Sequence, residues 1–233
     1  MDVSILGVRI SNLEKIQILE RIQNLFSVGK QVFVVTPNPE MLVLASKDAE
    51  FRELLNSADI ALPDGFGLSL AARLQGEKIV ERITGTDFLI DAVQLANKNN
   101  LSIYLLGGKN GVGEGVRKWL EQNNFEVNIQ TNEEEFRGDS AKKYAVFIAL
   151  GHGRQERVAK ELLSKFPNIV LAMGVGGAFD FLAGHIMRAP KIMRFFGLEW
   201  LFRLFVEPWR IKRIWNATVA FMYYVLKEKV SKM

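Results

Sequence analysis

The sequence of 233 residues has no cysteine, only two histidines and no long uncharged apolar run. Without cysteine there is neither a disulfide nor a thiolate metal site, and a reducing compartment fits. His152 and His185 are too few for a His-rich metal cluster. The longest uncharged apolar stretch, Ile214–Leu226, has 13 residues, whereas a membrane-spanning helix needs roughly 18. Residues 1–15 also lack the pattern of a signal peptide, so we expect a cytoplasmic protein.

The sequence contains no Asp-x-Asp pair. Many enzymes that use nucleotide sugars hold a divalent metal on the diphosphate with such a pair, because hard cations prefer carboxylate and phosphate oxygens. Without the pair, arginines and backbone amides must carry the charge of a bound diphosphate. We therefore expect a site that holds no metal and needs no cofactor.

The positive charge is concentrated at the C-terminal end. Residues 188–233 carry ten Lys/Arg and three Glu, a net charge of +7, so residues 1–187 carry −3. With 48% hydrophobic and 24% charged residues overall, the chain can bury a core. The basic segment is therefore where an anionic partner is expected to bind.

Short apolar runs alternate with helical spacing over the first 180 residues. Five runs are rich in Val, Ile, Leu and Phe and predict buried strands: Val32–Thr36, Ile60–Leu62, Ser102–Leu106, Ala145–Leu150 and Ile169–Met173. Helical spacing marks Leu13–Phe26, Phe66–Leu74, Asp87–Asn99, Val112–Gln122 and Gln155–Phe166. This alternation predicts an α/β fold, a Rossmann-like and mostly parallel sheet with helices on both faces.

The pattern changes near residue 190, where Pro190 disfavours helix at the residue before it. We expect a catalytic body over residues 1–190 and a helical C-terminal appendage over residues 191–233. Its helices are predicted at Ile192–Phe205 and Pro208–Lys229, the second with proline in its first turn.

Ligands of open α/β sheets bind beyond the carboxyl ends of the strands, so the loops there supply the candidate residues. Thr36 and Asn38, in Thr36-Pro37-Asn38-Pro39-Glu40, offer a hydroxyl and an amide to a ligand, or cap a helix. Asp64, in Pro63-Asp64-Gly65-Phe66-Gly67, can act as a general base, or likewise cap a helix.

Two further loops hold groups that suit a phosphate. Arg82, in Arg82-Ile83-Thr84-Gly85-Thr86-Asp87, precedes a helix that Thr84 or Thr86 can cap; it is either a phosphate clamp or a surface arginine. The glycine-rich run at 107–115 offers the backbone amides of Gly107 and Gly108 to a diphosphate. This run fits neither common nucleotide fingerprint, and a plain tight turn explains it equally well.

The last two loops before the appendage carry polar groups among glycines. Gln155, after Gly151-His152-Gly153-Arg154, can hold a sugar or a nucleotide. In the loop at 174–180, Phe179 can pack on a base and Asp180 can accept from ring N–H groups or ribose hydroxyls. The alternative for both loops is a glycine turn with capping side chains.

The appendage combines arginines with aromatic side chains. On a continuous helix Arg203, Arg210 and Arg213 share one face, although Glu207-Pro208 interrupts the run. Eight aromatic residues surround them: Trp200, Phe202, Phe205, Trp209, Trp215, Phe221, Tyr223 and Tyr224. This mixture suits the interface of an anionic membrane; packing on the body or in a homodimer is the alternative.

Taken in order, these motifs resemble the WecG/TagA/CpsF glycosyltransferase family from about residue 3 to residue 215. The resemblance rests on Thr36-Pro37-Asn38-Pro39-Glu40, Pro63-Asp64-Gly65, Arg82-x-x-Gly85-x-Asp87, Gln155-Glu156, Phe179-Asp180-Phe181-Leu182-Ala183-Gly184, Arg188-Ala189-Pro190, Leu198-Glu199-Trp200, Arg203 and Glu207-Pro208-x-Arg210. One departure is Gly151-His152-Gly153-Arg154, where the family pattern is Gly-x-Pro-Lys.

The resemblance implies a metal-independent, inverting enzyme at the inner face of the cell membrane. Its nearest branch moves N-acetylmannosamine from a UDP donor to undecaprenyl-diphosphate-linked N-acetylglucosamine, in the linkage unit of wall teichoic acid. Asp64 would be the general base, with Thr36, Asn38 and Gln155 positioning substrates. Arg82 would stabilise the leaving diphosphate, and Arg203, Arg210 and Arg213 would complete its cationic cage.

Three alternatives remain open from the sequence. The same family could use another UDP-sugar, such as N-acetylmannosaminuronic acid. The glycine run at 107–115 leaves a nicotinamide-dependent oxidoreductase open. The charge of the tail also suits nucleic acid, whose binding would weaken steeply with salt, but the aromatic residues favour lipid, and we expect no nucleic-acid partner.

Overall fold

The computed structural model describes residues 2–108, 110–123, 125, 129–132, 135–187, 189–190, 192–193 and 198–231. At its centre lies a parallel sheet with the strand order β4-β3-β8-β7-β5-β6. The strands are β3 (Val32–Val35), β4 (Ile60–Ala61), β5 (Ser102–Gly107), β6 (Ile129–Asn132), β7 (Tyr144–Ala149) and β8 (Ile169–Gly174). The α/β fold class is confirmed, and all five predicted strands are present. The sequence missed β6 and an antiparallel hairpin formed by β1 (Val3–Ile5) and β2 (Val8–Ile10).

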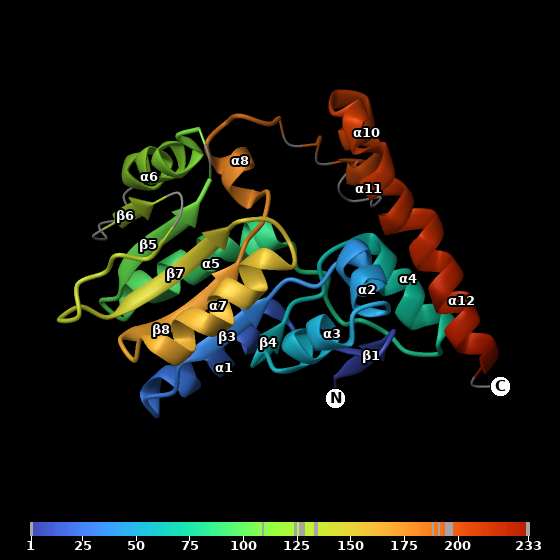
Figure 1. The fold of residues 1–233 in the computed structure, drawn as a ribbon, viewed down its shortest axis with the longest axis horizontal. Helices are drawn as coiled ribbons and strands as arrows, with labels where there is room; N and C mark the ends of the chain where they lie inside the picture. Colours follow the sequence, from blue (N-terminus) through green and yellow to red (C-terminus); the bar gives the residue numbers. More distant parts are fainter. Residues whose placement is uncertain are drawn as a thin grey trace.

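Side chains alternate along the strands between two hydrophobic cores, one on each face of the sheet. Val32 and Val34 belong to one buried cluster, and Phe33 and Val35 belong to the other. Strands β3, β4, β5, β7 and β8 contribute to both cores and are covered on both faces, which is why they are predominantly apolar and do not alternate with polar residues. The first core packs against α1 (Lys15–Ser27), α5 (Gly85–Lys98), α6 (Val112–Gln122) and α8 (Ala178–Leu182). The second packs against α2 (Pro39–Ala45), α3 (Ala49–Asn56), α4 (Phe66–Leu74) and α7 (Arg154–Lys165) (Figure 1).

Helix starts near the sheet edge are set by capping side chains. The Thr84 hydroxyl accepts a hydrogen bond from the Asp87 N–H at 3.2 Å, so α5 begins at Gly85, two residues earlier than predicted. Asn38 caps α2 in the same way, through the Met41 N–H at 3.0 Å. These two caps fix the loops that follow β3 and precede α5, which are both candidate ligand loops.

The tail after residue 198 forms a bent helical run. It comprises α10 (Glu199–Val206), η1 (Pro208–Arg210), α11 (Ile211–Trp215), the π-helical turn η2 (Asn216–Ala220) and α12 (Phe221–Ser231). The run breaks at Glu207-Pro208, because proline cannot supply the N–H that a continuous helix requires. No helix in the described part of the chain is long and apolar enough to cross a membrane.

The tail lies along α2 and α4 (Figure 1) and completes their core. Phe221 and Val225 are fully buried and belong to the second core. Gly67 makes this approach possible, because a Cβ at that position would lie 3.5 Å from the Phe221 ring and 2.7 Å from Pro39. Farther along α12, the Glu228 carboxylate accepts a hydrogen bond from the Leu6 N–H at 3.2 Å. The tail is therefore held against the body by apolar and polar contacts together.

Candidate active site

A polar cleft of about 440 Å³ opens beyond the carboxyl ends of β3, β4, β7 and β8. The chain passes from β3 to β4 on one side, while β8 pairs with β3 on the other, and such a switch point is where open α/β sheets bind ligands. The cleft is lined by the loops after these strands, by the start of α5 and by the tail. Among the residues predicted from sequence, it is lined by Thr36, Asn38, Asp64, Gln155, Asp180, Arg203 and Arg213.

Asp64 lies at the start of α5, held there by the loop after β4. Its N–H donates to the Pro37 carbonyl at 3.2 Å, and the Gly85 N–H donates to its carboxylate. Burial raises the pKa of Asp64 to about 7, with the Glu199 carboxylate acting in the same direction; the Gly85 hydrogen bond and Arg82 oppose the rise. A carboxyl whose pKa lies near the working pH is suited to accept a proton in a reaction.

Thr36 and Gly85 confine the position of this carboxylate. A Cβ on Gly85 would lie 3.3 Å from Thr36 Cγ2 and 3.6 Å from Asp64 Oδ2, so only glycine fits without displacing a neighbour. The Thr36 hydroxyl donates to the Gly174 carbonyl at 3.3 Å and joins β3 to β8. Thr36 thus supports the cleft from beneath, and the Asn38 side-chain oxygen is engaged in capping α2.

Gln155 ties together the two loops after β7 and β8. Its Nε2 donates to Glu156 Oε1 at 2.7 Å, and its Oε1 accepts from the Gly176 N–H at 3.1 Å. Glu156, fully buried, also accepts from the Gly153 N–H at 2.6 Å, and burial raises the pKa of Glu156. The buried amide of Gln155 therefore fixes the shape of the loop at 174–177 as well as lining the cleft.

Gly153 explains the departure from the family pattern Gly-x-Pro-Lys. Its φ is +85°, a conformation that proline cannot adopt because its ring fixes φ near −65°. Its N–H also donates to Glu156, and proline has no such donor. The loop before α7 in this chain therefore requires glycine where the pattern has proline.

The structure corrects the prediction for Phe179 and leaves Asp180 in place. Phe179 is buried in the core, so its ring cannot stack on a base; Phe181 lines the cleft instead. Residues two apart on a helix point in nearly opposite directions, which is why only one of the two faces the cleft. The guanidinium of Arg203 lies 4.5 Å from the centre of the Phe181 ring. Arg203 and Asp180 both approach Gly177, where a side chain would fill the space between them.

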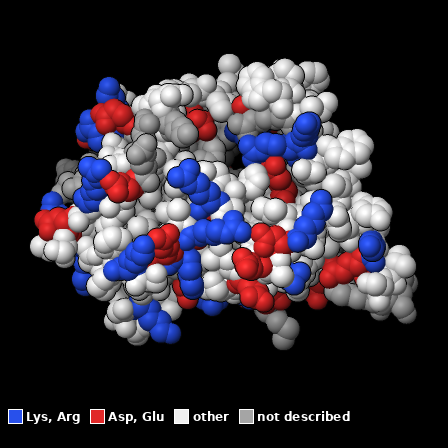
Figure 2. Space-filling model, viewed as in Figure 1, with Lys and Arg blue, Asp and Glu red and all other residues white. Residues whose placement is uncertain are grey.

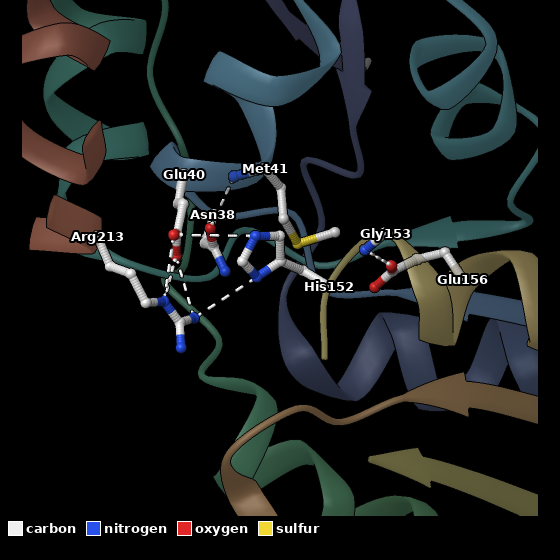
Figure 3. A network of polar contacts seen from close by, with 7 residues as sticks. All are labelled: Asn38, Glu40, Met41, His152, Gly153, Glu156 and Arg213. Carbon is white, nitrogen blue, oxygen red and sulfur yellow. Dashed lines mark hydrogen bonds and ion pairs between the residues drawn. The ribbon is translucent and has the colours of Figure 1, made fainter. Parts of the chain in front are cut away.

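Arg213 lines the cleft and joins the tail to Glu40 on α2 (Figure 3). Its Nε and Nη2 donate to the Glu40 carboxylate at 3.1 Å, and Nη2 lies 3.5 Å from His152 Nδ1. Burial lowers the pKa of His152 and Arg213 lowers it further, against the effect of Glu40. Figure 2 shows Lys and Arg side chains gathered where α11 crosses the body, with acidic side chains directly beside them. Arg213 thus reaches the cleft as one half of an ion pair.

Besides Phe179, four predicted residues lie elsewhere or have side chains outside the described part of the chain. Gly107 and Gly108 line neither this cleft nor the cavity beside it. They have positive φ angles, +96° and +73°, and pack closely against Ala149 and the start of α6, which matches the tight-turn alternative. Arg82 lines the neighbouring cavity. The side chain of Arg210 lies outside the described part of the chain.

Sequence reasoning missed Glu199 and Trp200 as site residues. Both belong to α10 and line the polar cleft as well as the adjacent cavity. Their motif contributed to the family resemblance, but nothing in their local pattern showed that the tail would fold back over Asp64. Among the described residues, no group of three or more His, Asp or Glu side chains could hold a metal ion; metal independence stays a prediction.

The sequence model of the glycosyl transferase WecG/TagA/CpsF family matches residues 3–233. A relative from Bacillus subtilis (strain 168), N-acetylglucosaminyldiphosphoundecaprenol N-acetyl-beta-D-mannosaminyltransferase, is 34% identical over 208 residues, which cover 85% of this chain and 80% of the relative. A protein of the same name from Staphylococcus aureus (strain MRSA252) is 29% identical over 238 residues, covering 97% and 93% of the two chains.

Proposed function

Because the chain belongs to the WecG/TagA/CpsF family of glycosyltransferases, we propose that it transfers N-acetylmannosamine from UDP-N-acetylmannosamine to undecaprenyl-diphosphate-linked N-acetylglucosamine. Two relatives are named for this sugar and this acceptor. The observation that carries the proposal is the position of the Asp64 carboxylate. Its pKa lies near neutral pH, and it lines a cleft that tail arginines also line. The product would be the linkage unit of wall teichoic acid.

In this reaction Asp64 takes the proton of the acceptor hydroxyl as that oxygen attacks the anomeric carbon. The new glycosidic bond forms on the face opposite the departing group, so the anomeric configuration is inverted. The bond between the anomeric carbon and the diphosphate breaks, and UDP leaves with the bonding electrons. The proton stays on Asp64 until solvent removes it, which a pKa of about 7 permits at neutral pH.

Among the side chains that the structure describes, Arg203 is the cation best placed for the departing diphosphate. It lies beside the glycine loop after β8, where backbone approach is unhindered, and it is held over the Phe181 ring. Arg213 lines the same cleft and donates two hydrogen bonds to Glu40 at 3.1 Å, whereas the Arg203 Nε lies 3.8 Å from the Glu207 carboxylate. We therefore assign Arg203 the larger share in stabilising the charge that develops on UDP, and Asp180 beside it the role of accepting from a hydroxyl of the donor.

The tail would also place the enzyme on the inner face of the cell membrane. Four large apolar side chains of the tail are between 60% and 77% exposed: Phe205, Trp209, Ile211 and Trp215. The basic residues Arg210, Lys212 and Arg213 lie among them in the sequence. Exposed aromatic side chains beside basic ones bind the interfacial layer of anionic lipid. Purified protein should cosediment with anionic vesicles, and Trp209→Ser combined with Trp215→Ser should reduce that binding without changing turnover of a soluble acceptor.

The proposal is tested by measuring UDP release from purified enzyme in EDTA. UDP-N-acetylmannosamine and N-acetylglucosamine-diphosphate-lipid should together give turnover, and omission of either substrate should abolish it. UDP-N-acetylmannosaminuronic acid, offered in the same assay, tests the other donor that the family leaves open. Turnover with that donor alone would show that the sugar is wrongly assigned. No turnover with either donor would show that the acceptor or the activity is wrongly assigned.

Arginine variants divide the catalytic contributions further. Arg203→Ala should lower kcat by roughly 10²- to 10³-fold, the usual cost of one donor to a developing anion. Arg213→Ala should cost less, because Arg213 lies 3.1 Å from Glu40, a closer ion pair than the 3.8 Å contact of Arg203 with Glu207. Arg21→Ala on α1, an exposed arginine that does not line the cleft, is the matched control. Equal losses in all three variants would contradict the assignment.

A further inference from the structure

A second cavity, of about 870 Å³, adjoins the polar cleft and differs from it in chemistry. Its walls are α4 on one side and α10, η2 and α12 of the tail on the other. We call it the apolar groove, because its lining is predominantly hydrocarbon. Its volume lies in the range of about 300–1,000 Å³ that is usual for sites that bury small ligands.

Large apolar side chains face the groove and remain partly exposed in the part of the chain that the structure describes. Phe66, Leu70, Leu198, Trp200, Tyr223 and Leu226 all line it, and they are between 37% and 61% exposed. Contiguous exposed apolar surface of this kind marks a place where an apolar partner binds. Single exposed leucines would need no explanation, but six large side chains around one concave surface do.

The groove and the polar cleft are continuous at the catalytic base. Asp64, Gly65, Thr84, Glu199 and Trp200 line both cavities. A molecule in the groove therefore has one end at the residue that would accept the proton. Only a ligand that is apolar along most of its length and polar at one end matches this arrangement.

Arg82 supplies the charge that such a ligand needs at the junction. It lines the groove, not the polar cleft, and it is near enough to Asp64 to lower the pKa of that carboxyl. The Asp64 and Glu199 carboxylates line this end of the groove too, and a guanidinium beside them is complementary to a phosphate or diphosphate group. Its position suits the diphosphate of the acceptor better than the diphosphate of the departing UDP.

We propose that the apolar groove holds the first isoprene units of the polyprenyl chain of the acceptor, with Arg82 at the acceptor diphosphate. This inference rests on the proposed function. The acceptor would then lie extended along the tail, with its sugar at Asp64, its diphosphate at Arg82 and its hydrocarbon chain between α4 and α12. Because the tail forms one wall, the enzyme would select a lipid-linked acceptor at the active site itself and not only by residing on a membrane.

The test is a series of soluble acceptors, N-acetylglucosamine-diphosphate esterified to a methyl group or to one, two or three isoprene units. UDP release is measured without vesicles and below the critical micelle concentration, so partition into lipid cannot contribute. Each unit that enters the groove should lower the acceptor KM by roughly tenfold, from the transfer of its apolar surface out of water. The KM for the UDP donor should stay constant along the series.

Two variants place the effect in the groove. Leu70→Ser and Leu226→Ser, on opposite walls, should flatten the dependence of the acceptor KM on chain length and leave the KM for the UDP donor unchanged. Val230→Ser is the matched control, an exposed apolar residue on α12 that does not line the groove. Thermal denaturation checks that each variant is folded, which we expect because both leucines are partly exposed.

Farnesyl diphosphate gives a measurement that needs no variant. It should inhibit competitively against the acceptor and not against UDP-N-acetylmannosamine. Two results would contradict the role of the groove and leave the proposed function intact. They are competition with the donor alone and a chain-length dependence that persists in both leucine variants. If no ester of any length supports UDP release, the proposed function itself fails and the inference falls with it.

Discussion

Replacing Asp64 with asparagine should separate the catalytic and the stability effects of this carboxyl. In the folded protein the pKa of Asp64 is raised from 3.8 to about 7, chiefly by burial. At about 1.36 kcal/mol per pKa unit, this rise corresponds to roughly 4 kcal/mol of preference for the protonated form. Asparagine resembles that neutral form in shape and keeps an oxygen that can accept from the Gly85 N–H.

The sign of the stability effect follows from proton uptake. Between pH 3.8 and about 7 the folded chain holds a proton on Asp64 that the unfolded chain has released. The stability of the wild type conferred by this group is therefore complete below pH 3.8 and is lost as the pH rises through about 7. Asp64→Asn should match the wild type near pH 4 and exceed it by as much as about 4 kcal/mol at pH 8.

The activity should change in the opposite direction over the same range. A general base works only when ionised, so kcat/KM of the wild type should rise about tenfold per pH unit up to about pH 7 and then level off. Loss of the base in Asp64→Asn should reduce kcat by roughly 10²- to 10⁴-fold. The variant should thus be more stable and nearly inactive at pH 8.

Urea denaturation of both proteins at pH 4, 6 and 8, together with pH–rate profiles, measures these effects. Burial also raises the pKa of Glu156, but this contribution is common to both proteins and cancels in their difference. Equal stability of the two proteins at pH 8 would show that Asp64 ionises at its ordinary pKa. A rate that is flat from pH 5.5 to 8.5, or full activity of the variant, would refute its role as base.

Glu199→Gln removes a carboxylate that raises the pKa of Asp64, so the alkaline-side plateau of kcat/KM should begin at lower pH. Arg82→Gln removes a cation that lowers this pKa, so the plateau should begin at higher pH. Shifts in one common direction in these two pH–rate profiles would contradict the electrostatic account. Gly67→Ala should destabilise the protein by about 1–3 kcal/mol, because a Cβ there would lie 2.7 Å from Pro39 and press on the tail; unchanged urea denaturation would show that α4 and α12 can move apart freely. UDP release should be undiminished in EDTA, and dependence on added Mg²⁺ would show that the arginines do not suffice for the diphosphate.

The burial of Phe221 changes how the tail should be tested. A chain ending near residue 190 would lose catalysis if tail arginines act on the diphosphate, but it would also uncover the core around α2 and α4. Such a chain therefore cannot separate catalysis from folding. Single substitutions of Arg203 and of exposed tail aromatics leave Phe221 and Val225 in place, and they distinguish the diphosphate ligand from the membrane anchor.

The sequence by itself determined the sheet and the loops at its edge. Runs of Val, Ile, Leu and Phe predict parallel strands, since only a strand covered on both faces is apolar throughout. Parallel strands bring the loops at their carboxyl ends to one edge, so Thr36, Asp64 and Gln155 could be expected to meet, and the structure places all three in one cleft. Strand β6 and the helices between β3 and β4 escaped prediction because they are short, and few residues carry their periodicity.

Only the tertiary structure decided which side chains of the tail and of α8 reach the cleft. Phe181, not Phe179, faces it, because the helix start fixes a rotation that the sequence does not reveal. Arg213 meets Glu40 across 173 positions of the chain, and Glu199 comes to lie beside Asp64. The apolar groove likewise exists only where α12 lies against α4. Local periodicity specifies the strands and helices, whereas these contacts depend on how the helices pack against the sheet and against one another.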